Sequence, residues 1–308
     1  MTDLKFPKVA LIAGPTASGK SALALALAEK HGGTIINADS MQVYADLRIL
    51  TARPSPEEEA RAPHRLFGHV DGADAYSAAR WAAEARAAIH EAHDEGRLPI
   101  LAGGTGLYMR TLLDGIAPVP EIDHAIRAEV RATPVADAHA QLAHIDAKSA
   151  ARLSPTDSAR ICRALEVIRS TGRPLHEWQS ERIGGIGGEI DLTALILLPD
   201  RDWLGERIDR RFAWMAQMAR SEVEALLGRT DIPADAPILR AIGVSELGRV
   251  LRGDTGLEQA CAAGALATRQ YAKRQYTWFR RQPPEAWPRT SETETNALLG
   301  YFETKCRI

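Results

Sequence analysis

A phosphate-binding loop is the clearest chemical feature of the sequence. Its residues fit the pattern G-x-x-x-x-G-K-[ST] and are Gly14, Pro15, Thr16, Ala17, Ser18, Gly19, Lys20 and Ser21. An apolar run at 9–13 precedes the loop and an alanine-rich segment at 21–31 follows it, which is the strand–loop–helix setting that the motif requires. The glycines let backbone N–H groups surround a phosphate at a helix N-terminus, Lys20 adds a positive charge, and the Ser21 hydroxyl can ligate Mg²⁺.

Asp39 and Thr105 follow two further apolar runs, at 34–37 and 98–102, and are candidates for catalysis. Ligands of open α/β sheets bind outside the carboxyl ends of the strands, so we expect these two residues to converge with Lys20. The run at 98–102 ends in glycines and a hydroxyl, without the carboxylate that holds magnesium in most triphosphate hydrolases and kinases. One carboxylate, a phosphate cradle and a hydroxyl suit displacement of a diphosphate leaving group. A helix-cap role for Asp39 and a turn role for Thr105 are the open alternatives.

A segment near the C-terminus, residues 268–281, is basic and aromatic, with five cations and no acid. Four of its residues share one face at helical spacing, namely Arg269, Lys273, Tyr276 and Arg280. Cations can bind phosphates and aromatic rings can stack on exposed bases, so this face is a candidate RNA contact. The alternative is a solvated basic face whose aromatic residues pack inward.

The segments around these residues predict an α/β fold, a parallel sheet with the phosphate loop and helices on both faces. Apolar runs at 9–13, 34–37 and 98–102 alternate with helical segments at 21–31 and 78–95, and a run at 192–198 could add a strand. After Asp200, a predicted N-cap, apolar residues at helical spacing indicate one long amphipathic helix that ends at Gly228.

In the stretch 118–188 the sequence pattern changes from apolar runs to charged, helical segments. This change predicts a mostly helical insertion into a core formed by residues 1–117 and 189–308. One of its helices is predicted to begin at Ser154, with Pro155 in the first turn and an acid at Asp157, and to end at Gly172. That helix carries a second basic pair, Arg160 and Arg163. The glycine-rich segment 184–188 is predicted to be a flexible connector.

Composition restricts the class of protein. The 308 residues are 45% hydrophobic and 25% charged, with a formal net charge of −2 that excludes a uniformly basic nucleic-acid coat. Three distant cysteines (Cys162, Cys261 and Cys306) fit neither a disulfide framework nor a zinc site, and His90 and His93 lack the H-E-x-x-H spacing. The sequence shows no signal-peptide pattern and no apolar run long enough for a membrane span, so we expect a cytoplasmic protein that does not bind membranes.

Together the motifs resemble those of the tRNA dimethylallyltransferases (isopentenyl-diphosphate:tRNA transferases) of bacterial type. The resemblance extends over nearly the whole chain, and the combination is far more specific than the phosphate loop alone. It rests on GPTASGKS at 14–21, NADSMQVY at 37–44, YSAARW at 76–81, GGTGLY at 103–108, RALEV at 163–167, AIGVSEL at 241–247 and TRQYAKRQYTWFR at 268–280.

The resemblance implies an activity: transfer of the dimethylallyl group of dimethylallyl diphosphate to N6 of the adenosine on the 3′ side of the anticodon in tRNA. The loop residues 16–21 would hold the donor diphosphate together with Mg²⁺, which Ser21 would ligate. Asp39 would be the general base, and Thr105 would contact the donor or the substrate nucleotide.

The resemblance also implies three groups of tRNA contacts. The motif after the run at 34–37 would contact the extruded adenine and its neighbours through Asp39, Ser40, Met41 and Gln42. The basic C-terminal helix would line the donor and tRNA channel with Lys273, Arg274 and Arg280. The insertion would contact the anticodon stem-loop through Arg127, Ala159, Arg160, Ile161, Cys162 and Arg163.

The chain departs from the family pattern at two places: Ala159 stands where many members have glutamine, and Val244-Ser245 where many have an aromatic residue and a cation. Three rival functions remain. The same chemistry on free adenylate is disfavoured by the basic insertion and C-terminal helix. A small-molecule kinase is disfavoured because this chain lacks a second acid at a strand end. A non-catalytic RNA-binding module is disfavoured because it would have no use for a phosphate loop. We expect a monomer.

Overall fold

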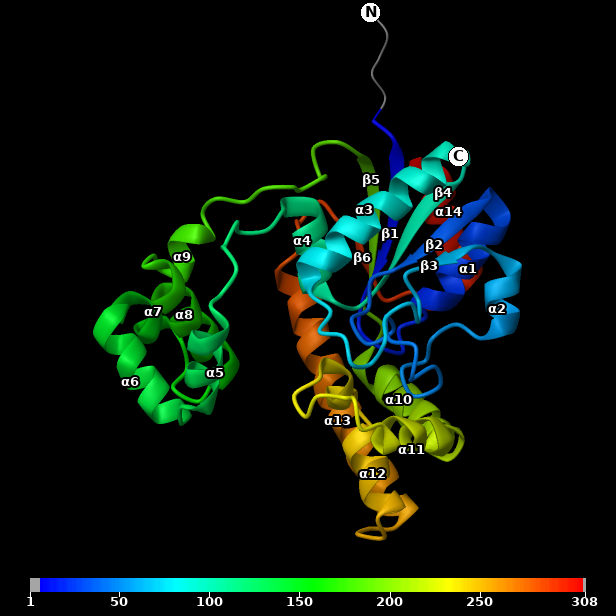
Figure 1. Cartoon of the computed structure of the whole chain (residues 1–308). Coiled ribbons are helices and arrows are strands. Elements are labelled where there is room, and N and C mark those ends of the chain that lie inside the picture. The colour runs from blue at the N-terminus through cyan, green and yellow to red at the C-terminus, as the bar shows by residue number, and fades with distance from the viewer. Residues whose placement is uncertain (1–5, 307–308) are drawn as a thin grey trace, which may run out of the picture. The chain divides into compact units, whose positions relative to one another are not determined.

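The structure, a computed structural model, describes residues 6–306 and contains a six-stranded sheet (Figure 1). The strand order is β3-β2-β4-β1-β5-β6, and the neighbouring strands pair in parallel. The strands are β1 (Lys8–Ala13), β2 (Gly33–Asn37), β3 (His64–Arg65), β4 (Leu98–Gly103), β5 (Asp191–Leu197) and β6 (Arg289–Thr290). The predicted fold class is confirmed. The two-residue edge strands are too short to produce a sequence pattern.

Helices cover both faces of this sheet, as a parallel sheet requires. They are α1 (Lys20–His31), α2 (Pro56–Arg61), α3 (Ala78–Asp94) and α14 (Thr295–Cys306). One face packs against α1 and α14 around the fully buried Ala10 and Ile12, and α3 crosses the other face (Figure 1). The fully buried Trp81 of α3 donates from its indole to the Asn37 carbonyl (2.8 Å), which joins that helix to the end of β2.

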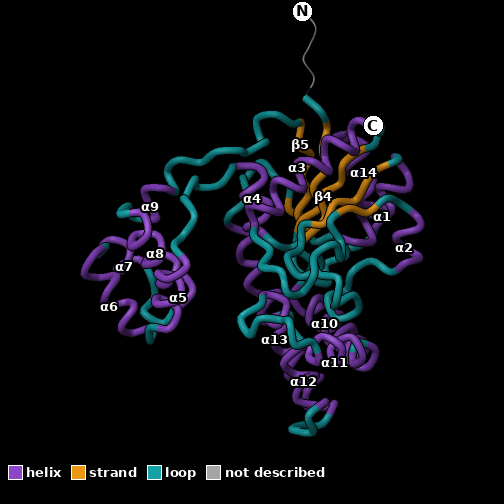
Figure 2. Tube along the Cα trace, viewed as in Figure 1, coloured by secondary structure: helices purple, strands orange, loops and turns teal. Residues whose placement is uncertain are grey.

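The remaining elements of this part of the chain are α4 (Gly106–Asp114), α10 (Arg201–Met218), α11 (Arg220–Gly228), the 3₁₀ helix η1 (Pro237–Arg240), α12 (Val244–Leu251) and α13 (Leu257–Arg281). Helices α10 and α13 pack against each other. Figure 2 shows the loops from the strands gathered between the sheet and this helix pair. The carboxyl ends of β1, β2 and β4 therefore face helical residues that lie far away in the sequence.

The amphipathic segment after Asp200 forms two helices where the sequence predicts one. Asp200 caps α10 as predicted, because its carboxylate accepts the N–H groups of Asp202 (2.8 Å) and Trp203 (3.2 Å). At Ala219 the backbone leaves the helix (φ −88°, ψ 3°), and α11 begins at the next residue. The prediction of a single long helix is therefore wrong. The stripe of buried side chains continues through Ala219 and Val223, so the spacing of apolar residues gives no sign of the break.

Residues 113–186 form a second compact unit, and the rest of the chain forms the first. The helices of the second unit are α5 (His124–Ala132), α6 (Val135–Ile145), α7 (Ala147–Arg152), α8 (Ser158–Thr171) and α9 (Leu175–Trp178). They enclose their own apolar core, in which Val130, Leu142 and Leu165 are fully buried.

Helix α8 begins later than predicted. Its cap is Asp157, which accepts the Arg160 N–H (3.2 Å), whereas the Ser154 hydroxyl accepts the Thr156 N–H (3.5 Å) in the preceding turn. Serine and aspartate both cap helices, so the sequence offers two starts three residues apart. The predicted end at Gly172 is confirmed by its left-handed φ of 71°.

The glycine-rich connector at 184–188 is packed in part rather than free along its length. A β-carbon on Gly185 would lie 2.6 Å from the Asp114 carbonyl carbon, and Ile186 is buried. The prediction of a flexible segment is therefore wrong for these two residues. Gly185 has no side chain and so permits close backbone packing, and the apolar Ile186 side chain is buried.

Within residues 6–306, none of the helices is both long and apolar enough to cross a membrane. The described side chains, those of residues 6–304, contain no group of three or more His, Cys, Asp or Glu residues that could hold a metal ion. Cys162 and Cys261 are free thiols. The first five residues, on which the signal-peptide expectation depends, and the side chain of Cys306 lie outside the described part of the chain.

Candidate active site

The phosphate loop leads from β1 into α1 at the carboxyl edge of the sheet. Two glycines are required by its geometry: Gly14 has φ 153° and a β-carbon there would lie 2.4 Å from the Leu197 carbonyl oxygen, and Gly19 has φ 96°. Gly19 is also the N-cap of α1 and offers no side chain to its first turn. The N–H groups at this helix end are therefore available to an anionic ligand.

Lys20 extends into the loop, where its Nζ donates to the Pro15 carbonyl (2.6 Å). Burial lowers the pKa of Lys20 to about 7; the nearby Asp39 carboxylate opposes this shift, and the Arg211 guanidinium adds to it. A desolvated ammonium in this position regains its preferred charge state when an anion binds beside it.

Asp39 occupies a tight turn at the carboxyl end of β2. Its N–H donates to Asn37 Oδ1 (2.8 Å), and its Oδ1 accepts the Met41 N–H (3.0 Å). The carboxylate thus caps a turn and not an α-helix, and it also lines two pockets.

Thr105 joins this turn from the end of β4. Its N–H donates to the Ala38 carbonyl (3.1 Å), and its Oγ1 accepts the Ser40 N–H (3.0 Å). Gly103 permits the approach, because a β-carbon there would lie 2.2 Å from the Ala38 carbonyl. The structure therefore brings Lys20, Asp39 and Thr105 to the same edge of the sheet.

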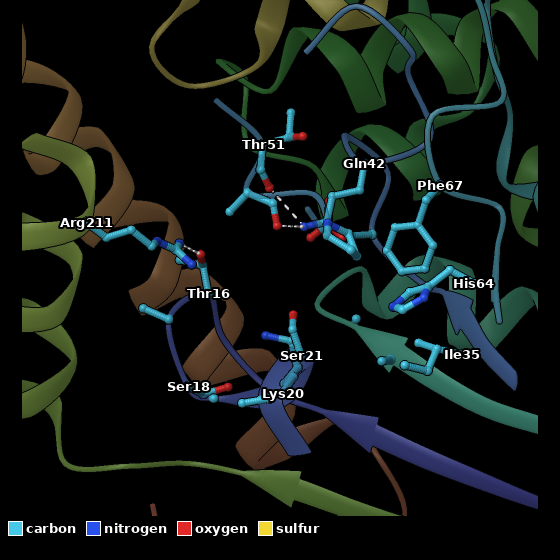
Figure 3. A pocket seen from close by; sticks show the side chains of 18 of the residues that line it. Thr16, Ser18, Lys20, Ser21, Ile35, Gln42, Thr51, His64, Phe67 and Arg211 are labelled. Carbon is cyan, nitrogen blue, oxygen red and sulfur yellow. Dashed lines mark hydrogen bonds between the residues drawn. The ribbon is translucent and has the colours of Figure 1, made fainter. Parts of the chain in front are cut away.

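Two pockets meet at Asp39. The first has a cavity volume of about 150 Å³ and lies over the phosphate loop, with Gln42, Thr51, His64 and Phe67 on its other side (Figure 3). The second, of about 330 Å³, is lined by Ser40 and Met41, by the apolar Leu50, Ile208, Phe212, Met215 and Ile242, and by Arg240, Thr268, Tyr271 and Arg274. Four residues line both pockets: Thr16, Asp39, Thr51 and Arg211. A polar, cationic pocket thus opens beside one with more apolar walls.

Arg211 of α10 is a site residue that sequence reasoning missed. Its guanidinium donates to the Thr16 hydroxyl, and Figure 3 shows it pointing at the loop. Burial lowers the pKa of Arg211, Arg207 lowers it further, and Asp39 opposes both. An arginine retains its charge under such a shift, so it adds a second cation at the junction of the pockets.

Gln275 of α13 is the other missed residue, although it lies inside the predicted basic helix. The buried side chain accepts the Thr16 N–H at Oε1 (2.8 Å) and donates from Nε2 to the Gly104 carbonyl (2.9 Å). It therefore connects the phosphate loop with the turn that carries Thr105. A polar residue in an otherwise apolar stripe, between Ala272 and Phe279, is the signal that could have identified it.

The predicted contact Gln42 supports the wall of the first pocket. Its Nε2 donates to the carbonyls of Thr51 and Ala52 (2.9 Å each). The loop before these residues is held by Glu222 of α11, whose carboxylate accepts the N–H groups of Arg48, Ile49 and Leu50 (3.0, 3.0 and 2.5 Å).

The basic segment is helical in α13, and its residues divide between several surfaces. Lys273 lines a groove with Arg269 and Tyr276 against α10, Arg274 lines the second pocket, and Arg280 is exposed. Phe279 is fully buried, and the Trp278 ring lies against Gly106. Two aromatic rings thus pack inward, as the alternative predicts, while the cations face pockets or solvent, and the RNA contact stays a prediction.

The predicted contacts on the insertion lie in the second unit and differ in exposure. Ala159 and Arg160 are exposed, while Arg127, Cys162 and Arg163 are half-buried. Ile161 is fully buried in the helical core, so the tRNA contact predicted for its side chain is wrong. A stretch of consecutive helical residues cannot face the solvent throughout. At least one side chain in it points to the buried side of the helix.

The first pocket suits Mg²⁺ bound together with a diphosphate. Its donors are hard oxygens, the Ser21 hydroxyl and the Asp39 carboxylate, and Mg²⁺ prefers few protein ligands supplemented by substrate phosphate oxygens and water. Ser21 is the residue that would hold the ion, because it lies in the first turn of α1 beside Lys20.

Comparisons with known proteins agree on one family. The family described as IPP transferase matches residues 42–282. The chain is 58% identical over 301 residues to the tRNA dimethylallyltransferase of Sphingopyxis alaskensis, covering 97% of this chain and 98% of that protein. It is 57% identical over 289 residues to the enzyme of the same name from Erythrobacter litoralis, covering 92% and 91%.

Solved structures give the same result. A full-length tRNA isopentenylpyrophosphate transferase from Bacillus halodurans is 33% identical with a TM-score of 0.69, and the match covers 97% of each chain. A eukaryotic dimethylallyltransferase, described as acting on tRNA, is 30% identical with a TM-score of 0.76, over 89% of this chain and 70% of that one.

Proposed function

Because this chain belongs to the IPP transferase family, among its tRNA dimethylallyltransferases, we propose that it transfers a dimethylallyl group from dimethylallyl diphosphate to N6 of the adenosine 3′ to the anticodon in tRNA. The observation that best supports this reaction is the meeting of two unlike pockets at Asp39. The polar pocket over the loop suits the diphosphate of the donor, and the more apolar pocket suits a flat base extruded from the anticodon loop.

In this arrangement the reacting carbon, C1 of the dimethylallyl group, lies at the junction of the pockets. N6 attacks C1 from the second pocket while the C1–O bond breaks toward the first, and the diphosphate leaves with the electron pair. The N6 proton passes to the Asp39 carboxylate, whose Oδ1 is already held by the Met41 N–H. Thr105 contributes by fixing the Asp39–Ser40 turn.

Negative charge grows on the diphosphate as the bond breaks, and this chain places fixed dipoles and cations around it. The loop N–H groups, Lys20 and Arg211 surround the first pocket, and groups oriented in advance are the largest contributors to many enzymatic rates. Mg²⁺ held by Ser21 would neutralise part of the same charge.

Recognition of tRNA requires the adenine to leave its stack in the anticodon loop, at a cost of a few kcal/mol. We propose that Ser40 and Met41 contact the base and its neighbours, while Gln42 supports the wall of the first pocket beside them. Three cations of α13, Lys273, Arg274 and Arg280, would bind the backbone near the pockets. Three arginines of the insertion would bind the anticodon stem, namely Arg127, Arg160 and Arg163. The enzyme would act as a monomer in the cytoplasm.

Mass spectrometry of nucleosides tests this function directly. Purified protein, unmodified tRNA, dimethylallyl diphosphate and Mg²⁺ should yield N6-dimethylallyladenosine at a single position, absent when that adenosine is replaced by guanosine. Free adenosine monophosphate and ATP are the comparison substrates. Prenylation of the free nucleotide with no product on tRNA would instead favour an adenylate transferase, and phosphate release from ATP a kinase.

Loss of a cation on α13 is expected to flatten the salt dependence of tRNA binding. Each phosphate contact removed by Lys273→Ala or Arg280→Ala should reduce the slope of log K against log salt by about 0.7 to 0.9. Filter binding at several salt concentrations measures the slope. Arg97→Ala is the control, because Arg97 precedes β4 at the opposite edge of the sheet. An unchanged slope in the first two variants would assign those residues to the diphosphate or the fold.

Binding of inorganic diphosphate is expected to take up a proton above pH 7. Lys20 has a pKa of about 7 in the free protein and is mostly neutral at pH 8, and the anion favours its charged form. Affinity should therefore fall as the pH rises from 7 to 9. Calorimetry at pH 8 in buffers of different ionisation enthalpy counts the protons. Lys20→Arg stays charged and should lose this uptake; equal uptake in both proteins would contradict the assignment.

A further inference from the structure

Tyr271 of α13 is a polar side chain of the second pocket, and the proposed mechanism gives it no role. It lines the second pocket with Asp39, Ser40 and Met41. Its ring lies 5.7 Å from the guanidinium carbon of Arg274, which restricts its tilt. The phenol therefore lines this pocket from α13, whereas Asp39 lines it from the turn after β2.

The hydroxyl of Tyr271 lies near a short chain of hydrogen bonds. The Ser40 N–H donates to Thr105 Oγ1 (3.0 Å), and the Thr105 hydroxyl donates to Ser40 Oγ (3.3 Å). Thr105 also acts on the pKa of Tyr271 as a hydrogen-bond partner. Tyr271 lines the second pocket, so its proton can point into that pocket.

This phenol remains a donor over the working pH range. Burial raises the pKa of Tyr271, the Asp39 carboxylate raises it further, and the Thr105 hydrogen bond opposes them in part. Asp39 is an acceptor when ionised. The second pocket is thus lined by a phenol that can donate and by a carboxylate that accepts.

We propose that Tyr271 donates a hydrogen bond to N1 of the substrate adenine, beside the N6 proton that Asp39 accepts, and so sets the preference for adenine. This inference rests on the proposed function. The Watson–Crick edge of adenine offers a donor at N6 and an acceptor at N1, which matches the pair. Guanine offers the reverse, an acceptor at O6 and a donor at N1. Its O6 would face the Asp39 carboxylate, acceptor against acceptor, and its N1 could not accept the Tyr271 proton.

The test varies the phenol and the base nitrogen together. Anticodon stem-loop RNAs carrying adenosine or 1-deazaadenosine, which has C–H in place of N1, are prenylated by the wild type and by Tyr271→Phe. Tyr301→Phe is the matched control, because Tyr301 lies on α14 outside both pockets and its hydroxyl donates to the Ala194 carbonyl (3.2 Å). Single-turnover rates and kcat/KM are measured, with thermal melting of each variant.

We expect Tyr271→Phe to lower kcat/KM on the adenosine RNA about 3- to 10-fold, the range for one neutral hydrogen bond, and to leave kcat/KM on the 1-deazaadenosine RNA unchanged. Equal losses on both RNAs, or no loss on either, would overturn the assignment. The wild-type arm does not depend on folding of a variant. If the wild type fails to modify the adenosine RNA, the proposed function itself is overturned, and this inference with it.

Discussion

Asp39→Asn is expected to lower the single-turnover rate of prenyl transfer by about 10²–10⁴-fold, the contribution of a positioned general base. Asparagine keeps the size of the side chain and can still accept the Met41 N–H, so the turn after β2 is preserved. It cannot take the N6 proton. Because the lost interaction forms only in the transition state, the Kd values for tRNA and dimethylallyl diphosphate should change little.

Rapid-quench kinetics with enzyme in excess, together with thermal unfolding, separates this role from a structural one. Asp94→Asn, an exposed substitution at the end of α3, is the control for the amide exchange itself. If Asp39 only stabilises its turn, the variant should unfold more easily, by about 1 kcal/mol or less, and retain its single-turnover rate. A stable Asp39→Asn protein with the wild-type rate would exclude Asp39 as the base.

Sequence reasoning located the half of the site that comes from the strand ends. The phosphate loop, Asp39 and Thr105 each follow an apolar run directly, and in a parallel sheet every such run ends at the same edge. The local sequence therefore identifies these residues and also predicts that they lie at the same edge of the sheet. Gly103 packs closely on Ala38 because the strands β2 and β4 that precede them are neighbours in the sheet.

The helical half of the site could not be located in this way. Arg211 and Gln275 bind Thr16 from 195 and 259 residues away, and periodicity gives only the buried face of a helix, not the element that covers it. Arg210 and Arg211 are adjacent and identical in type, yet Arg210 is exposed while Arg211 reaches the loop. The break between α10 and α11 at Ala219 was missed for a related reason. The backbone angles change at one residue, and the spacing of the apolar residues stays the same.

Arg211→Gln is expected to lower kcat by about 10²–10³-fold, the effect of removing one preorganised group from a site where negative charge develops. The guanidinium lines both pockets and donates to Thr16, so it can follow the charge from the bridging oxygen onto the departing diphosphate. The kcat of Arg211→Lys should lie between those of the wild type and Arg211→Gln, because lysine keeps the charge but lacks the planar set of donors of a guanidinium. Arg210→Gln, on the same helix and outside both pockets, is the control.

The stability of the Arg211→Gln protein separates catalysis from folding. Lys20, Arg207 and Arg211 line the first pocket together with the Asp39 carboxylate, and burial and Arg207 both lower the pKa of Arg211. Removing one of these like charges should leave the Tm of the free protein unchanged or raise it, while the Tm increase caused by inorganic diphosphate becomes smaller. That result would mean that the cations of the free site repel one another and that the bound diphosphate relieves this repulsion. A lower Tm in the free variant, with normal turnover of the remaining folded protein, would instead make Arg211 a structural support of the loop.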